Sequence, residues 1–163
     1  MIVNDEFCEK VRLYEDAMYA LAFSILRNDQ DASDAISESI MKAYCNVSQL
    51  KNANAFKPWL LKIVNNTCLE MLRNKHATVS IDEQYDIEDN TNACDISTKL
   101  VLRQAVEQLA QPYRTVVVLF YYENLSIIEI ATITGGSIIA VKKQLSRARS
   151  MLRDSLNKED FFG

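Results

Sequence analysis

The sequence contains very little glycine and proline, with three and two residues respectively in a chain of 163. Sandwiches and barrels built from many short strands need far more of both in their turns, whereas helices joined by short connections need few. Hydrophobic residues still make up 48% of the chain, which is enough to form a buried core. This balance predicts an all-α protein.

Long apolar runs and clustered metal ligands are also missing. No stretch approaches the roughly 20 apolar residues of a membrane-spanning helix. Asp5, Glu6 and Glu9 stand near the start, where a signal peptide would be basic, so we expect a cytoplasmic protein.

The cysteines form no CxxC pair and there is one histidine, His76, so we expect ordinary thiols and no metal or other cofactor. The cysteines are Cys8, Cys45, Cys68 and Cys94.

Charge is distributed unevenly along the chain, although the net charge is only -4. Residues 1–76 carry a net charge of -1, residues 77–97 carry -6, and residues 98–163 carry +3. The middle segment is rich in acids, lacks helical periodicity and is predicted to link two domains. Residues 142–153 hold five basic side chains and no acid, a pattern that favours contact with DNA phosphates.

The first domain is predicted to contain three or four helices. Apolar residues recur at helical spacing over 4–27, 31–48 and 55–75. In the second segment, acids four residues apart share one face with an apolar side chain, which suits an arginine-rich protein partner. A catalytic carboxylate pair is the alternative, but no histidine, cysteine or third acid stands at a suitable spacing, so we expect no enzymatic activity. The residues of this face are Asp34, Ser37, Glu38, Met41 and Lys42.

The second domain is predicted to contain four helices, over 98–110, 112–123, 126–134 and 137–157. Ser126 and Glu129 have the spacing of a capping box at the start of the third. A glycine pair then provides a turn, and Ser137 can cap the basic final helix. Short helix, glycine turn and basic helix describe a helix-turn-helix; an antiparallel helical pair with a solvated charged face is the alternative. The residues expected to face inward from the final helix are Ile138, Val141, Leu145, Ala148 and Leu152.

The segment 125–152, LSIIEIATITGGSIIAVKKQLSRARSML, resembles the helix-turn-helix with which the sigma-70 superfamily recognises the minus-35 promoter element. Response regulators carry a related motif, so this segment by itself identifies a DNA-binding domain rather than a sigma factor. Ile139, Ala140 and Gln144 depart from the family pattern, which has a small residue, Thr and Arg there. These departures affect the positions expected to determine base specificity.

The first domain resembles the same family. Residues 31–38, DASDAISE, are similar to the DAEDLVQE segment, although Ser37 replaces the usual Gln. Residues 56–73, FKPWLLKIVNNTCLEMLR, resemble the helix that engages the minus-ten element. The two motifs occur in the family's order on either side of a linker, and no separate domain corresponds to region three. The chain therefore resembles the extracytoplasmic-function (ECF) group of sigma factors.

This resemblance implies two small helical domains, a sigma region 2-like domain over 1–76 and a sigma region 4-like domain over 98–163, joined by the linker 77–97. The acidic face of the first domain would bind the clamp coiled coil of core RNA polymerase. The minus-ten residues would be Lys57, Lys62, Asn65, Asn66 and Arg73, and the minus-35 residues Arg114, Ser137, Ala140, Lys142, Lys143, Gln144 and Arg147.

The implied partners are core RNA polymerase, through its clamp and flap, promoter DNA and an anti-sigma factor, which is often membrane-bound; no small-molecule substrate is implied. The implied role is promoter-specific initiation in a stress or envelope response. A conventional helix-turn-helix regulator that is not a polymerase subunit remains the alternative. A protein-interaction adaptor without a DNA role would leave the basic stretch from Lys142 to Arg153 unexplained.

Overall fold

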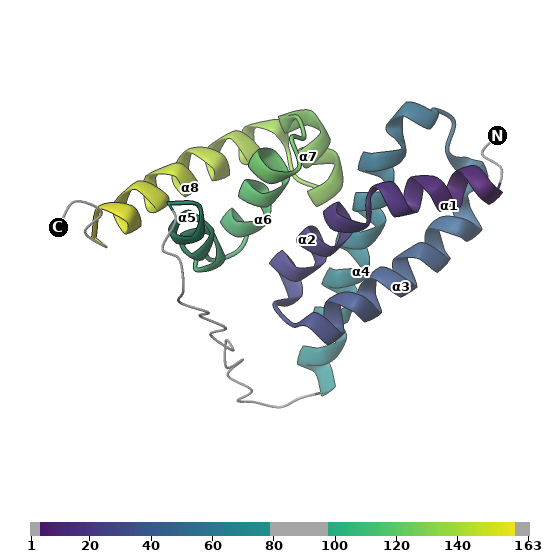
Figure 1. Ribbon diagram of the computed structural model, residues 1–163, viewed down its shortest axis with the longest axis horizontal. Helices are drawn as coiled ribbons and strands as arrows, with labels where there is room; N and C mark the ends of the chain where they lie inside the picture. The colour runs from purple at the N-terminus through teal and green to yellow at the C-terminus, as the bar shows by residue number, and fades with distance from the viewer. Residues whose placement is uncertain (1–3, 79–97, 159–163) are drawn as a thin grey trace.

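The structure is a computed structural model that describes residues 4–78 and 98–158, and these two ranges contain helices and turns but no β-strand. The predicted all-α class is confirmed. Figure 1 shows the N-terminal helices on one side of the molecule and the C-terminal helices on the other. Most of the predicted linker 77–97 lies outside the described residues, since only its first two residues belong to the helix before it. Within the described ranges, no helix is long and apolar enough to cross a membrane.

The N-terminal domain contains four helices, the larger of the two predicted numbers, because the predicted helix over 4–27 breaks at Tyr14. There the backbone leaves helical geometry, with φ -107° and ψ 12°. After the second helix, Arg27 adopts a left-handed conformation and Asn28 caps the next helix by accepting a hydrogen bond from the Asp31 amide. The elements are α1 (Asn4–Leu13), α2 (Glu15–Leu26), α3 (Asp29–Asn46), the 3₁₀ turns η1 (Val47–Gln49) and η2 (Ala53–Ala55), and α4 (Phe56–Thr78).

The core of this domain lies where α4 meets α2 and α3. Met18 and Leu21 of α2 and Leu60 of α4 are fully buried. Trp59 is partly buried and packs on Phe56, with ring centroids 5.6 Å apart. Cys68 is fully buried as well, and its burial raises the pKa of the thiol to about 12. Cys68 is therefore an inert packing residue.

The C-terminal domain has the predicted order of helices, with one irregularity. The predicted second helix is a short α-helix that continues as a π-helix, in which the Glu123 amide donates to the Val118 carbonyl five residues earlier. The elements are α5 (Thr98–Glu107), α6 (Tyr113–Val117), the π-helix η3 (Val118–Tyr122), α7 (Ile127–Thr134) and α8 (Ile138–Lys158).

Local capping forms the helix-turn-helix as predicted. The Ser126 hydroxyl accepts from the Glu129 amide at 3.1 Å, and the Glu129 carboxylate accepts from the Ser126 amide at 3.0 Å. Gly135 ends α7 with φ 77°, a conformation that favours glycine. Ser137 then caps α8 by accepting from the Ala140 amide at 3.0 Å. Val141, Leu145 and Ala148 are buried as expected, whereas Ile138 is 43% exposed at the first position of the helix.

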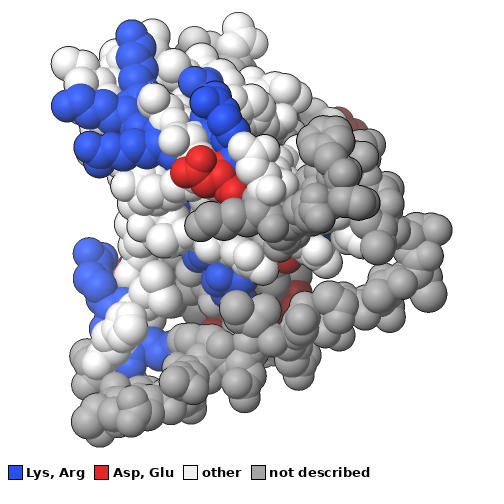
Figure 2. Space-filling model, turned by 90° about the vertical axis from the view of Figure 1, so that its left-hand side faces the viewer, with Lys and Arg blue, Asp and Glu red and all other residues white. Residues whose placement is uncertain are grey.

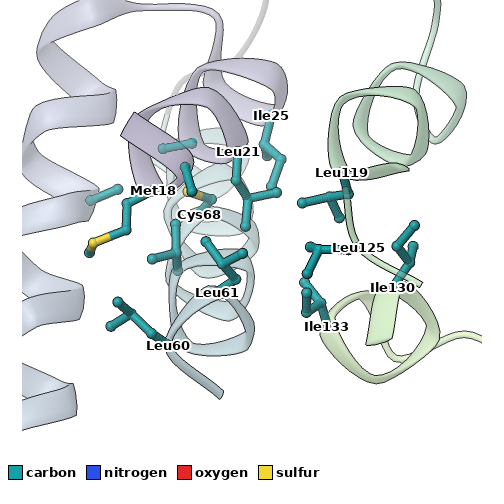
Figure 3. Close-up of a cluster of buried hydrophobic side chains, with 14 of the residues drawn as sticks. Met18, Leu21, Ile25, Leu60, Leu61, Cys68, Leu119, Leu125, Ile130 and Ile133 are labelled. Carbon is teal, nitrogen blue, oxygen red and sulfur yellow. The ribbon is translucent and has the colours of Figure 1, made fainter. Parts of the chain in front are cut away.

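The two domains pack directly against each other. Helix α7 lies along α4, and α6 and η3 contact α2. Figure 3 shows Leu21, Ile25 and Leu61 of the N-terminal domain facing apolar side chains of the C-terminal domain, all of them buried. The C-terminal residues of this shared core are Leu119, Leu125, Ile130 and Ile133.

Candidate polymerase and promoter interfaces

The acidic face on α3 lies at the surface. Asp34, Ser37, Glu38 and Met41 are all exposed, and Met41 is 70% exposed although it is apolar. The opposite side of α3 is occupied by small buried residues that pack against the rest of the domain, so the exposed side chains contribute little to the core. The structure therefore presents the predicted combination of carboxylates and an exposed methionine on one helix.

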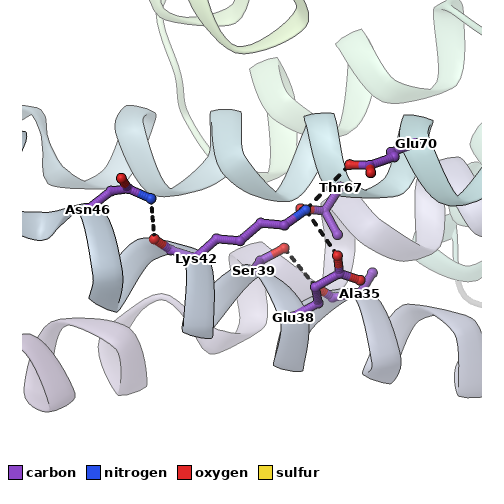
Figure 4. Close-up of polar contacts among 7 residues, drawn as sticks. All are labelled: Ala35, Glu38, Ser39, Lys42, Asn46, Thr67 and Glu70. Carbon is purple, nitrogen blue, oxygen red and sulfur yellow. Dashed lines mark hydrogen bonds and ion pairs between the residues drawn. The ribbon is translucent and has the colours of Figure 1, made fainter.

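Lys42, the fifth residue of this face, connects α3 to α4 (Figure 4). Its Nζ lies 3.0 Å from the Glu38 carboxylate, 3.4 Å from that of Glu70 and 3.3 Å from the Thr67 hydroxyl. The hydrogen bond with Glu38, opposed by burial and assisted by both carboxylates, raises the pKa of Lys42 above its ordinary value. Glu70 and Thr67 were missed in the sequence because they come from another helix.

The predicted minus-ten residues on α4 divide between surface and interior. Lys62, Asn66 and Arg73 are exposed. Asn65, by contrast, is only 4% exposed, because its position on the helix faces the core of the domain. Its assignment as a surface DNA contact is therefore corrected by this structure.

Lys57, at the start of α4, is held by the C-terminal domain. Its Nζ donates to the Glu123 backbone carbonyl at 3.0 Å and lies 3.7 Å from the Glu123 carboxylate. It also lies 5.7 Å from the centroid of the Tyr14 ring. In this structure Lys57 makes a contact between the two domains, and its predicted contact with minus-ten DNA stays a prediction.

The predicted minus-35 residues of α8 form a basic surface on its outer side. Lys142, Lys143 and Arg147 are exposed, whereas Ala140 and Gln144 are partly buried beside them. Figure 2 shows Lys and Arg side chains gathered at the upper left of the face turned to the viewer, with an acidic patch directly beside them. Ser137 is exposed, but its hydroxyl is engaged in capping the helix. This arrangement can attract phosphates along one side of a helix.

Two further side chains belong to this surface. Ile139, next to Ala140, is 67% exposed and offers an apolar group at the N-terminal end of α8. Arg149 is held against η3, since its Nε donates to the Tyr121 hydroxyl at 2.6 Å and its guanidinium lies 5.8 Å from the Phe120 and Tyr121 ring centroids. The family pattern alone indicated neither the exposure of Ile139 nor the anchoring of Arg149.

Arg114 is not on the DNA-facing surface of this structure. The side chain is 7% exposed, and its guanidinium donates to the Ser24 carbonyl at 2.6 Å and the Leu109 carbonyl at 2.8 Å. Burial, together with repulsion from Arg27, lowers the pKa of Arg114 to about 10. In this arrangement Arg114 is buried between the domains, and its predicted role as a phosphate clamp stays a prediction.

The described residues offer no arrangement for metal chemistry. Within them, no group of three or more His, Cys, Asp or Glu side chains could hold a metal ion. Cys8 and Cys45 are exposed free thiols on different helices, and Cys94 lies outside the described residues. The surfaces available are therefore an acidic face with an apolar side chain and a basic helix.

Two family models match this chain. The model described as Sigma-70 region 2 matches residues 11–78, and the model described as Sigma-70, region 4 matches residues 99–152. The first covers α2, α3 with the acidic face, and α4. The second covers the helix-turn-helix and most of α8. The two matches thus fall on the two structural domains.

Curated relatives align over nearly the whole chain. The chain is 35% identical over 153 residues to RNA polymerase sigma factor SigV of Bacillus subtilis (strain 168), covering 90% of this chain and 89% of SigV. It is 29% identical over 168 residues to ECF RNA polymerase sigma factor SigW of the same organism, covering 94% of this chain and 90% of SigW. Both alignments therefore include most of each domain of this chain.

Solved structures share the fold. Sigma factor RpoE from Bartonella quintana, in its complex with the anti-sigma factor NepR, matches with a TM-score of 0.73 at 24% identity, covering 95% of this chain and 98% of that chain. CnrH, in complex with the cytosolic domain of CnrY, matches with a TM-score of 0.67 at 20% identity, covering 96% of this chain and 90% of that chain. With two matching family models and relatives aligned along its length, the chain belongs to the sigma-70 family of RNA polymerase sigma factors, in its extracytoplasmic-function group.

Proposed function

We propose that this chain binds core RNA polymerase as a promoter-specificity subunit, recognises minus-35 DNA and separates the strands of the minus-ten element. Its role is binding rather than catalysis, because opening a promoter breaks no covalent bond. Since it acts with RNA polymerase, its place of action is the cytoplasm. The observation that carries the proposal is the presence of two chemically opposite surfaces on two domains, an acidic face on α3 and a basic face on α8.

The polymerase-binding surface is the exposed face of α3. Asp34 and Glu38 offer carboxylates to arginine side chains, and Met41 adds an exposed apolar side chain on the next turn of the helix. Lys42 holds Glu38 in place from the side and links it to Glu70 of α4. A face of this kind suits a cationic helical partner such as the clamp coiled coil. The carboxylates can accept charge-assisted hydrogen bonds from the partner's cations, and the exposed Met41 side chain can be buried between the two proteins.

The minus-ten surface is the exposed side of α4. Separating and unstacking bases costs a few kcal/mol per base, which binding to the single strand must offset. Asn66 can pair with a base edge, and Lys62 and Arg73 can attract the backbone. All three are exposed. The loop from Ser48 to Ala55, which precedes α4, is proposed to receive a flipped base.

The minus-35 surface is the start and outer side of α8. A helix that enters the major groove places its first residues nearest the bases. Lys143 and Gln144 can hydrogen-bond to base edges, and Ala140 and Ile139 can contact thymine methyl groups. Lys142 and Arg147 are proposed to contact phosphates.

An anti-sigma factor is a further expected partner. Two solved structures of similar fold are complexes, one of the sigma factor RpoE with the anti-sigma factor NepR and one of CnrH with the cytosolic domain of CnrY. We propose that an anti-sigma factor binds this chain and keeps it inactive. If that anti-sigma factor is a membrane protein, the bound chain is held at the membrane. A stress or envelope signal then releases the chain.

Two charge reversals test whether the α3 face binds core polymerase and the α8 face binds minus-35 DNA. Asp34→Arg is expected to abolish binding to core polymerase in a pull-down while leaving the helical circular dichroism unchanged, because the side chain is exposed. Arg147→Glu is expected to retain core binding but to lose initiation at promoters that depend on a minus-35 element.

Each variant is a control for the other. Both replace an exposed side chain, so both should fold, and each should lose only one of the two binding activities. If Asp34→Arg bound core polymerase with unchanged affinity, the assignment of the α3 face would be wrong. A chain that bound duplex promoter DNA tightly without polymerase, and gave no core-dependent transcript, would instead be a conventional helix-turn-helix regulator.

A further inference from the structure

The proposed minus-ten surface of α4 includes an acidic side chain. Glu70 is the only acidic residue in the sequence of α4. It is exposed and lies four residues after Asn66 and three before Arg73, so these three side chains share one side of the helix. A carboxylate between two side chains that are proposed to contact DNA repels the phosphates of a bound strand. A cation beside Glu70 would remove this repulsion.

That cation is Lys42, which comes from α3. Its Nζ lies 3.4 Å from the Glu70 carboxylate and donates to Thr67 Oγ1 at 3.3 Å. Thr67 is buried, so its hydroxyl group is a fixed point for the ammonium group. Within residues 4–78 and 98–158, the ion pairs of Glu70 involve Lys42 alone. The charge of Glu70 is therefore balanced from a different helix.

The same ammonium group also belongs to the proposed polymerase-binding face. Lys42 Nζ lies 3.0 Å from the Glu38 carboxylate, and Figure 4 shows this contact beside the two contacts to α4. The side chains of Glu38 and Glu70 are 50% and 54% exposed, so each carboxylate is open to a ligand. Lys42 thus lies between a carboxylate proposed to bind polymerase and a carboxylate in the minus-ten surface.

A polymerase arginine that pairs with Glu38 competes with Lys42 for that carboxylate. An arginine can bind a carboxylate through two parallel hydrogen bonds, which a lysine cannot do. The positive charge of the arginine also repels Lys42, and the Glu70 carboxylate is already within 3.4 Å of its Nζ. Occupation of Glu38 therefore leaves more of the charge of Lys42 to Glu70, and the minus-ten surface becomes more positive.

We propose that Lys42 is a positioning residue for minus-ten recognition: it neutralises Glu70 in the DNA-binding surface of α4, and it does so more completely when polymerase occupies Glu38. This inference rests on the proposed function. It changes the predicted role of Lys42 from a polymerase contact to a link between the two surfaces. Because exposed ion pairs contribute little to folding stability, the link affects DNA binding far more than it affects unfolding.

Charge removal in the holoenzyme tests the neutralisation of Glu70. Core polymerase is saturated with each variant, and its affinity for a labelled single strand that carries the minus-ten sequence of a mapped promoter is measured by fluorescence anisotropy. Lys42→Gln is expected to weaken binding about threefold. It is also expected to lower the logarithmic salt slope by about 0.7, the value for one charge on a single strand. Adding Glu70→Gln to Lys42→Gln is expected to restore both quantities.

Lys42→Gln combined with Asp154→Asn is the matched control. It has the same net charge as the rescued variant, but it removes an exposed carboxylate from α8 in the other domain. This control should bind the strand as weakly as Lys42→Gln alone. The proposal is overturned if Glu70→Gln restores no more binding than Asp154→Asn does, or if Lys42→Gln binds the strand as well as the unaltered chain.

Glu38→Gln in the free chain tests the link to polymerase, because it releases Lys42 from Glu38 without any partner present. At low salt the free variant is expected to bind the same strand about threefold more tightly than the unaltered chain, and Lys42→Gln is expected to abolish this gain. A gain no larger than that of Asp154→Asn would overturn the link.

Core-dependent transcription by the unaltered chain separates this inference from the proposed function. If the chain initiates with core polymerase but these differences in affinity are absent, only the role of Lys42 is wrong. If no core-dependent start is found, the proposed function is wrong, and the role of Lys42 falls with it.

Discussion

Met41 shows how a single exposed side chain can be assigned to binding rather than to folding. It is 70% exposed on the acidic face of α3, so little of its apolar surface is buried by the fold. We expect Met41→Ser to leave the free energy of unfolding nearly unchanged but to weaken core polymerase binding roughly tenfold, or by about 1.4 kcal/mol. Titration of labelled chain with core enzyme measures this change.

Leu13 provides a matched control, because it is an apolar side chain that is 71% exposed and lies at the end of α1, outside the proposed face. Leu13→Ser should change neither stability nor core affinity. If both variants lost the same affinity for core polymerase, Met41 would not be a specific contact in the polymerase interface.

Single residues also show what the sequence could and could not predict. Asn65 was predicted to contact DNA, yet Leu61, Val64 and Cys68 are buried at positions that place Asn65 on the same stripe of α4. Helical periodicity could therefore have identified Asn65 as an inward residue. Arg114 is different, because its burial depends on Ser24, ninety positions away in the chain. No local pattern contains that information.

At the scale of elements, the turn between α7 and α8 sets the geometry of the helix-turn-helix. Gly135 has a φ of 77°, whereas Gly136 is not in this left-handed region. A side chain at Gly135 would be strained, so Gly135→Ala should lower the free energy of unfolding by about 1 kcal/mol. Urea unfolding followed by circular dichroism measures this loss.

Gly136→Ala is the control for this substitution. Its added Cβ would meet the Thr134 hydroxyl at 3.6 Å, an ordinary contact, so its effect on stability should be small. If the two alanine variants were equally stable, the left-handed backbone conformation would not be the reason that glycine is needed at position 135.

Most elements were predicted from local signals, and the exceptions have physical reasons. The capping box at Ser126 and Glu129, the glycine turn and the Ser137 cap are contained in a few consecutive residues, and all three are confirmed. The break at Tyr14 was missed because neither proline nor glycine marks it. The π-helical end of the predicted helix over 112–123 was missed as well, since the sequence gives no sign of the altered hydrogen bonds.

At the scale of the whole molecule, the two domains could be predicted but their contact could not. Segmental charge and motif order indicated two helical units, and the family models match each of them. The packing of α7 on α4 depends on apolar side chains that each domain would otherwise expose, such as Leu61 and Ile133. The periodicity of one helix cannot distinguish a side chain buried within its own domain from one buried by another domain.

Core-dependent initiation in vitro shows whether this chain gives RNA polymerase its promoter specificity. Purified chain, core enzyme and genomic fragments would be combined, and transcript starts mapped. We expect starts that appear only when chain and core are both present, each preceded by the same pair of sequence elements near minus-ten and minus-35. Starts that do not change when the chain is omitted would contradict it.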